Sequence, residues 1–209
     1  MGLKERRERE KQARREQILN AARELLHEKG IHAASMNQIA KKAELGVATL
    51  YSYFKNKEDL FIALQQEGLD LLKSHLMKVL DHQTDPRIKL RDMAWAFLEF
   101  SQQQKKFYYI INYFISNPEI LFEPQLKDLV DLRAQKTLSV VETVVREGIE
   151  QGVFKPIDSM RCTIMFWGLI HSLTLYKKLE STILRNDNHT EIYIFAVQHF
   201  IDSISQDPA

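Results

Sequence analysis

Apolar residues recur at helical spacing along most of the chain. In the first such stretch they lie three and four residues apart, on one face of a helix, at Ile18, Ala21, Ala22, Leu25 and Leu26. Gly30 follows as a stop signal, so a helix is predicted over about 10–29. No segment alternates apolar and polar residues between turn signals, and seven glycines are too few for many hairpins. We therefore expect an all-α fold of about nine helices.

Capping signals place the next helices. Ser35 with Gln38 three residues later forms a capping-box pattern, which predicts a helix over about 36–43. A short helix over 47–53 follows a tight turn, and Asn56 can cap the helix after it. The remaining pattern predicts helices at about 57–81, 87–104, 106–116, 122–151, 157–183 and 189–205.

The last two predicted helices contain segments that are apolar on every side. These segments are 164–170 and 192–197. A helix of this kind must be covered on two sides, and a chain of 209 residues has few interior helices. We expect a homodimer formed through helices 157–183 and 189–205; the alternative is that both lie inside a monomeric bundle.

The two short helices have the size and composition of a helix-turn-helix. Leu50 and Phe54 are spaced to pack inward, which leaves small and hydroxyl side chains free to enter a DNA major groove about 12 Å wide. The residues expected to approach base edges are Val47, Ala48, Thr49 and Ser52. Those expected to approach phosphates are Tyr51, Tyr53 and Lys57.

Charge is distributed unevenly, although the net charge is only +1. Residues 1–60 contain 13 Lys and Arg against 9 Asp and Glu, whereas residues 61–209 contain 16 against 19. A basic amino-terminal part suits a polyanionic partner; the alternative is a solvated charged helix. Segment 4–15 is either an arm that extends the first helix and touches the DNA backbone or minor groove, or a helix with i, i+4 pairs such as Glu5 with Arg9 and Glu10 with Arg14; we favour a mixture of the two. Of its residues, Arg14 and Arg15 are expected to reach double-stranded DNA.

The stretch from Ile39-Ala40 through Thr49-Leu50-Tyr51-Ser52-Tyr53-Phe54-Lys55-Asn56-Lys57 resembles the signature of the TetR family of bacterial transcriptional regulators. The resemblance covers about residues 14–64. It implies a DNA-binding domain over 1–56 and an effector-binding and dimerisation domain over 57–209. It also implies DNA-contact roles for Ser35 and Asn37, and release of a pseudo-palindromic operator on effector binding. We expect a repressor; the alternatives are an activator of the same fold or an all-α protein-interaction module.

Two residues of the turn depart from the family pattern. Glu44 occupies a position where glycine is usual, and Gly46 occupies a position where a capping Ser or Thr is common. A residue other than glycine at positive φ costs about 1 kcal/mol, and a glycine cap loses only a few tenths. The geometry of the turn is therefore the open point in the resemblance.

Aromatic residues are dense between 95 and 122. Core packing explains any one of them, but ligand sites in helical bundles are also apolar and aromatic, with a few polar groups. We expect a small hydrophobic or aromatic effector to bind among Trp95, Phe100, Phe107, Tyr113, Phe166, Trp167 and His171.

The sequence lacks the combinations that enzymes require. The histidines show no metal-ligand spacing, no glycine-rich phosphate loop occurs, and Cys162 lies nine residues from His171 on one predicted helix. We expect no catalytic activity, metal or cofactor. The apolar run 162–176 is shorter than a membrane span, and no secretory signal is evident, so we expect a cytoplasmic protein that does not bind membranes.

Overall fold

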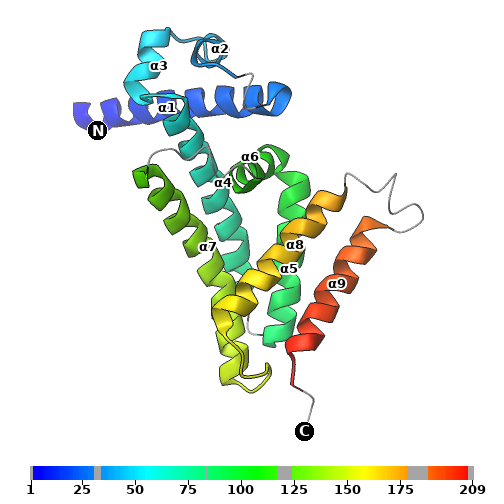
Figure 1. Cartoon of the computed structure of the whole chain (residues 1–209). Coiled ribbons are helices and arrows are strands. Elements are labelled where there is room, and N and C mark those ends of the chain that lie inside the picture. Colours follow the sequence, from blue (N-terminus) through cyan, green and yellow to red (C-terminus); the bar gives the residue numbers. More distant parts are fainter. Residues whose placement is uncertain (1, 31–33, 83, 117–123, 178–187, 207–209) are drawn as a thin grey trace. The chain divides into compact units, whose positions relative to one another are not determined.

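The computed structural model describes residues 2–30, 34–82, 84–116, 124–177 and 188–206, which form nine α-helices (Figure 1). They are α1 Leu3–Lys29, α2 Met36–Lys42, α3 Val47–Tyr53, α4 Lys57–Leu80, α5 Pro86–Gln103, α6 Lys105–Ser116, α7 Pro124–Glu150, α8 Ser159–Tyr176 and α9 His189–Ile204. Within these ranges the only β pairing is an isolated bridge between Phe154 and Ser205. The all-α prediction is confirmed.

Most helix limits lie within two residues of the predicted ones. The exception at an amino terminus is α1, which begins at Leu3 and not near residue 10. Its early turns are stabilised locally, since the Arg6 guanidinium lies 2.8 Å from a carboxylate oxygen of Glu10. α8 ends at Tyr176, and the predicted residues 178–183 lie outside the described part of the chain, as do 122 and 123.

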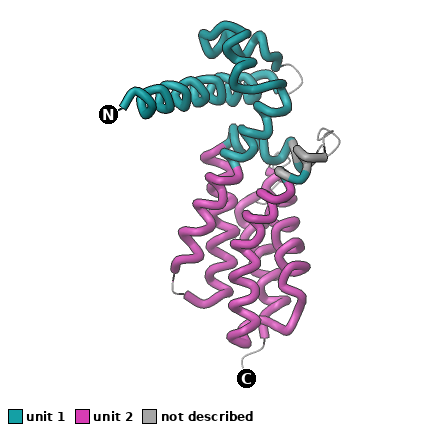
Figure 2. The backbone as a smooth tube through the Cα atoms, turned by 90° about the vertical axis from the view of Figure 1, so that its left-hand side faces the viewer, with its two compact units in different colours: residues 1–68, 105–130 teal, residues 69–104, 131–209 magenta. Residues whose placement is uncertain are grey.

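The chain divides into two compact units (Figure 2). Unit 1 comprises Met1–Gly68 and Lys105–Val130, and unit 2 comprises Leu69–Gln104 and Asp131–Ala209. The functional boundary expected at residue 56 stays a prediction. In this division into compact units, the first part of α4 and the whole of α6 belong with the amino-terminal helices.

Unit 1 has one apolar core to which α1, α2, α3, α4 and α6 contribute. Its fully buried members include Ile18, Leu26, Ile39, Leu50 and Leu64. From α6, Ile110 joins the same cluster with 1% of its surface exposed. The helix-turn-helix is therefore supported by α6 as well as by α1 and α4.

In unit 2, α5, α8 and α9 pack together. The Tyr193 hydroxyl on α9 donates a hydrogen bond of 2.7 Å to the Ala94 carbonyl on α5. After α7 the chain pairs with the end of α9, where Lys155 N donates to the Ile204 carbonyl at 2.8 Å. Phe154 covers Gly148 so closely that a Cβ atom there would lie 2.1 Å from the ring. Glycine is therefore required at position 148.

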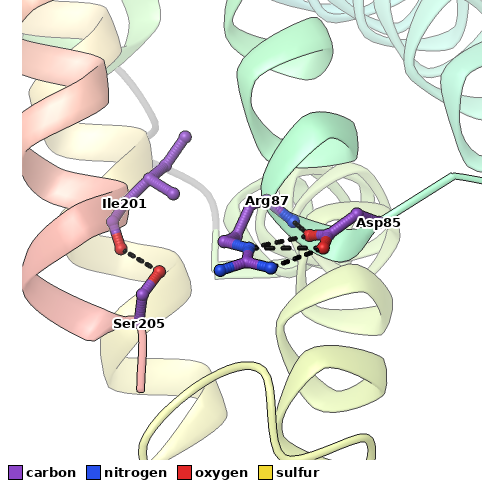
Figure 3. Close-up of polar contacts among 4 residues, drawn as sticks. All are labelled: Asp85, Arg87, Ile201 and Ser205. Carbon is purple, nitrogen blue, oxygen red and sulfur yellow. Dashed lines mark hydrogen bonds and ion pairs between the residues drawn. The ribbon is translucent and has the colours of Figure 1, made fainter. Parts of the chain in front are cut away.

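The ends of α5 and α9 are closed by local hydrogen bonds (Figure 3). A carboxylate oxygen of Asp85 accepts from Arg87 N at 2.8 Å, and the Arg87 guanidinium lies 2.7 Å from the same carboxylate. The side-chain bond from Arg87 lowers the pKa of Asp85. At the end of α9, Ser205 Oγ donates to the Ile201 carbonyl at 2.8 Å. None of the described helices combines the length and apolar character needed to span a bilayer.

Candidate nucleic-acid interface

The amino end of α2 has the capping box that the sequence predicted. Ser35 Oγ accepts from Gln38 N at 3.3 Å, and the Gln38 side chain accepts from Ser35 N at 3.1 Å. Ser35 and the neighbouring Asn37 are both exposed. They are thus accessible to a phosphate near the amino terminus of α2.

The turn between α2 and α3 places Glu44 at φ 54°, the only positive φ at a non-glycine residue in the described chain. Glu44 thus has the left-handed conformation in which glycine is usual, which answers the question that the sequence left open. Leu45 N donates to the Ala40 carbonyl at 2.9 Å, and Gln17 from α1 donates to the Ala43 carbonyl at 2.7 Å. These bonds hold the turn in spite of its strain. Gly46, at φ −65°, has an ordinary extended conformation.

α3 has a buried side and an exposed side. Leu50 and Phe54 are 0% and 3% exposed and belong to the unit 1 core, as the spacing predicted. The remaining surface presents four small side chains to solvent, those of Val47, Ala48, Thr49 and Ser52. This surface can enter a major groove without displacing any core residue.

The three residues expected at phosphates differ in how freely they can move. Tyr51 is 49% exposed, whereas Tyr53 is half-buried against the unit 1 core. The Lys57 ammonium lies 5.2 Å above the centre of the Phe61 ring, and partial burial lowers the pKa of Lys57. Lys57 opens α4, next to Asn56, whose side chain accepts from Asp59 N at 2.8 Å. Its position is therefore fixed close to the amino end of that helix.

The two predicted arginines of α1 have different environments. Arg14 is exposed. The Arg15 guanidinium lies 5.4 Å over the Phe54 ring and 3.8 Å from the Glu67 carboxylate. Arg15 thus contacts the end of α3 and also α4, while Arg14 is free to meet DNA.

Sequence reasoning missed Arg23 as an organising residue. Its guanidinium pairs with Glu67 on α4 at 2.6 Å and lies 4.2 Å above the ring of Phe107 on α6. Burial raises the pKa of Glu67, although the hydrogen bond from Arg23 acts in the opposite direction. In the sequence Arg23 looks like any other charged helix residue, so no local pattern could have identified it.

The aromatic residues predicted to line an effector site do not all lie in the same compact unit. Phe107 lies under Arg23 and Tyr113 packs against the unit 1 core. The other five predicted residues are in unit 2: Trp95, Phe100, Phe166, Trp167 and His171.

Two of these unit 2 residues form an aromatic cluster together with Phe97. The His171 ring lies 4.5 Å from Phe97 and 5.0 Å from Trp167, measured between ring centres. His171 is 8% exposed, and its Nε2 has no hydrogen-bond partner among the described residues. Burial lowers the pKa of His171 to about 4, so the imidazole is neutral at pH 7.

The remaining three unit 2 residues lie in separate environments. Phe100 packs edge-on against His75, and Phe166 packs against Phe200. Trp95 is 43% exposed and helps to line a surface cavity of about 150 Å³ between α5 and α9.

α8 and α9 expose large apolar side chains. Exposure reaches 55% at Ile164, 65% at Met165 and 63% at Phe195. Side chains of this size are usually covered, so these helices have the character of an interface.

Comparison with known proteins agrees with the geometry of the amino-terminal unit. The family model "Bacterial regulatory proteins, tetR family" matches residues 18–64. The transcriptional activator FasR of Mycolicibacterium smegmatis is 35% identical over 109 residues, which cover 51% of this chain and 50% of FasR. The repressor KstR2 of the same organism is 26% identical over 144 residues, 69% of each chain. The relatives are transcription regulators, one an activator and one a repressor.

The fold is shared along nearly the whole chain with a solved regulator. FadR from Bacillus subtilis, in complex with stearoyl-CoA, superposes with a TM-score of 0.72 at 20% identity. The superposition covers 90% of this chain and 98% of FadR. At this identity the likeness establishes the architecture of the chain.

Proposed function

Because this chain belongs to the TetR family of bacterial transcriptional regulators, we propose that it is a homodimeric repressor released from its operator by a small hydrophobic effector. One observation carries the DNA-binding part of the proposal. α3 buries Leu50 and Phe54 and presents its small side chains to solvent at the end of unit 1 formed by the helix-turn-helix.

The contacts divide into two groups by their chemistry. Val47, Ala48, Thr49 and Ser52 approach base edges and thymine methyl groups, which carry the sequence information. The residues that hold the duplex through phosphates are Arg14, Arg15, Ser35, Asn37, Tyr51, Tyr53 and Lys57. Two copies of α3 in a dimer would enter successive major grooves, so the operator is pseudo-palindromic.

Dimerisation through α8 and α9 is supported by their exposed apolar side chains. Ile164, Gly168 and Leu175 lie at i, i+4 and i+11 on the outer side of α8. Gly168 has open space where a side chain would be, which permits close approach of a second helix. Burying this surface against a second copy would remove it from water.

The effector site is proposed in unit 2, around Phe97, Trp167 and His171. A neutral imidazole among aromatic rings favours an uncharged polar group on an otherwise apolar ligand, because a carboxylate there would lack a compensating cation. A carbonyl group attached to a hydrocarbon chain has this chemistry. The acyl thioester part of the stearoyl-CoA that FadR binds has this chemistry. We therefore propose an acyl-CoA as the effector class, with its charged CoA part outside this aromatic cluster.

Release of DNA requires coupling between the two sites. α4 contributes residues Lys57–Gly68 to unit 1 and Leu69–Leu80 to unit 2, so one continuous helix belongs to both. An effector that binds one arrangement of this helix better would lower the affinity for DNA, and DNA would lower the affinity for the effector by the same factor.

The first test is selection of bound duplexes from a random DNA pool at about 0.1 M salt, followed by sequencing. A palindromic consensus is expected, and no enrichment, even after unfolding and refolding to remove a co-purified ligand, would overturn the proposal. Acyl-CoAs of increasing chain length are then added to the complex, with free CoA as the control. Release by an acyl-CoA supports the effector class, and transcription from a promoter carrying the operator distinguishes repression from activation.

A further inference from the structure

α1 extends well beyond the core of unit 1. Every residue from Leu3 to Arg14 is exposed, and the first buried residue of the helix is Ile18. At 1.5 Å per residue the exposed part is roughly 18 Å long. Figure 2 shows the amino-terminal turns of this helix projecting from the rest of unit 1.

Four basic side chains lie in line along one side of this projection. Steps of three and four residues lead backward from the buried Leu25 and Ala21 to Ile18, and then to Arg14, Lys11, Arg7 and Lys4. Such steps stay on one side of an α-helix, so these four residues, the basic stripe, continue the face that packs into the core.

Two acidic residues flank this line at helical spacing: Glu8 lies between Lys4 and Lys11, and Glu10 lies between Arg7 and Arg14. Glu5 accepts a hydrogen bond of 3.1 Å from Gly2 N, and Glu10 pairs with Arg6, which is outside the basic stripe. No member of the stripe has an ion pair within the described residues. The stripe therefore keeps its positive charge available to a partner.

The direction of the stripe is set where the projection meets the core. Arg15, beside Arg14, places its guanidinium over Phe54, the residue at which α3 ends. Ile18, the next residue along the line of the stripe, belongs to the same core cluster as Leu50 and Phe54, so the stripe continues the side of α1 that packs against the helix-turn-helix.

We propose that the basic stripe binds the phosphates of DNA that flanks the sequence read by α3. This inference rests on the proposed operator binding and adds a second, sequence-independent contact to it. Lysine and arginine at intervals along one rigid face match a row of phosphates. Leu3 is the single large apolar side chain of the projection, whereas an interfacial membrane helix inserts a whole apolar face, so a lipid surface is disfavoured.

The test uses two double variants that remove the same charge from the same helix. Arg7→Gln/Lys11→Gln alters the stripe, whereas Arg6→Gln/Arg9→Gln alters other faces of the projection. Glutamine has nearly the helix propensity of lysine and arginine, so helix content should be equal, which circular dichroism checks. Each full-length variant is titrated with the selected operator duplex, both minimal and extended by about 10 base pairs at each end.

For the extended duplex we expect Arg7→Gln/Lys11→Gln to weaken binding about tenfold at low salt. The slope of log affinity against log salt should fall by about 2 to 4, because a dimer loses two to four phosphate contacts. On the minimal duplex it should match the wild type, and Arg6→Gln/Arg9→Gln should bind both duplexes as the wild type does.

An equal loss of affinity for the extended duplex in both double variants would overturn this proposal, because it would indicate a general effect of positive charge. The proposal is also wrong if both double variants bind the extended duplex and the minimal duplex as tightly as the wild type does. Failure of the wild type to bind any duplex would overturn the proposed function itself, and the stripe with it.

Discussion

The Arg23 guanidinium on α1 and the Glu67 carboxylate on α4 lie 2.6 Å apart, and the same guanidinium rests 4.2 Å above the Phe107 ring of α6. One cation thus ties together three helices of unit 1. The Arg23 and Glu67 side chains are only 17% and 23% exposed, so loss of either leaves a poorly solvated partner.

Replacing Arg23 with methionine should lower the free energy of unfolding by about 1–3 kcal/mol, because a buried charged group loses its partner. Urea unfolding of the full-length protein measures the change. Arg14→Met, on the same helix but exposed, is the control and should change stability by less than about 0.5 kcal/mol. Equal effects of the two substitutions would contradict the role assigned to Arg23.

Replacing Glu44 with glycine should raise the free energy of unfolding by about 0.5–1 kcal/mol. At φ 54° a side chain is strained, and relief of that strain outweighs the greater freedom of glycine in the unfolded chain. Gly46→Ala is a matched control at φ −65°, where an added Cβ meets its nearest atom at an ordinary 3.7 Å. It should lower the free energy of unfolding by about 0.5–1 kcal/mol, because Gly46 is the N-cap of α3 and alanine caps less well than glycine. A loss of stability in Glu44→Gly would show that the turn is not strained.

Substitutions on α3 should separate affinity from specificity. Tyr51→Phe removes a hydroxyl suited to a phosphate and should weaken binding to all duplexes by a similar factor. Thr49→Ala or Ser52→Ala should change which duplex is preferred, with a discrimination of about 1–3 kcal/mol at the affected base pair. Repeating the selection with each variant provides the measurement, and an unchanged consensus for both Thr49→Ala and Ser52→Ala would contradict base contact by these residues.

His171 should make stability depend on pH. Its pKa is lowered by burial to about 4 in the folded protein, against an ordinary value of 6.5, so below pH 6.5 the unfolded chain binds a proton that the folded chain does not. Stability therefore falls as pH falls from about 6.5 to about 4. Between pH 7.5 and pH 5 this residue accounts for a loss of about 2 kcal/mol.

The variant His171→Leu isolates that contribution. Urea unfolding of wild type and variant is measured at pH 7.5, 6 and 5. The free energy of unfolding of the wild type should fall relative to that of His171→Leu as pH falls. A difference that stays constant over this range would show that His171 is charged or solvated in the folded protein.

The exposed apolar side chains of α8 and α9 should be required for dimerisation. Met165→Glu combined with Phe195→Asp introduces like charges at two positions that are 65% and 63% exposed in the free chain. Light scattering after size exclusion should show monomers with retained helix content. Leu3→Glu, at a residue 79% exposed on the α1 projection, is the control and should leave the dimer intact. If the double variant is still a dimer, the interface does not include Met165 and Phe195.

Local sequence determined the helices and their ends. The capping box of Ser35 and Gln38 and the cap at Asn56 depend on residues three positions apart, so the pattern alone was sufficient. The inward side of α3 followed in the same way from the spacing of Leu50 and Phe54. Apolar periodicity placed the start of α1 too late, near residue 10, because its exposed early turns carry no apolar pattern and are held by charged pairs such as Arg6 with Glu10. The charge pattern of segment 4–15 did indicate a helix there.

Only the tertiary structure decided which helices pack together. Phe107 and Tyr113 looked like companions of Trp167 and His171 in one aromatic set, yet α6 carries them into unit 1. Arg23 gained its importance in the same way, since its partners are 44 and 84 residues away along the chain. Helical periodicity records which side of a helix is apolar, but the identity of the covering helix depends on contacts between segments distant in sequence, which no local pattern encodes.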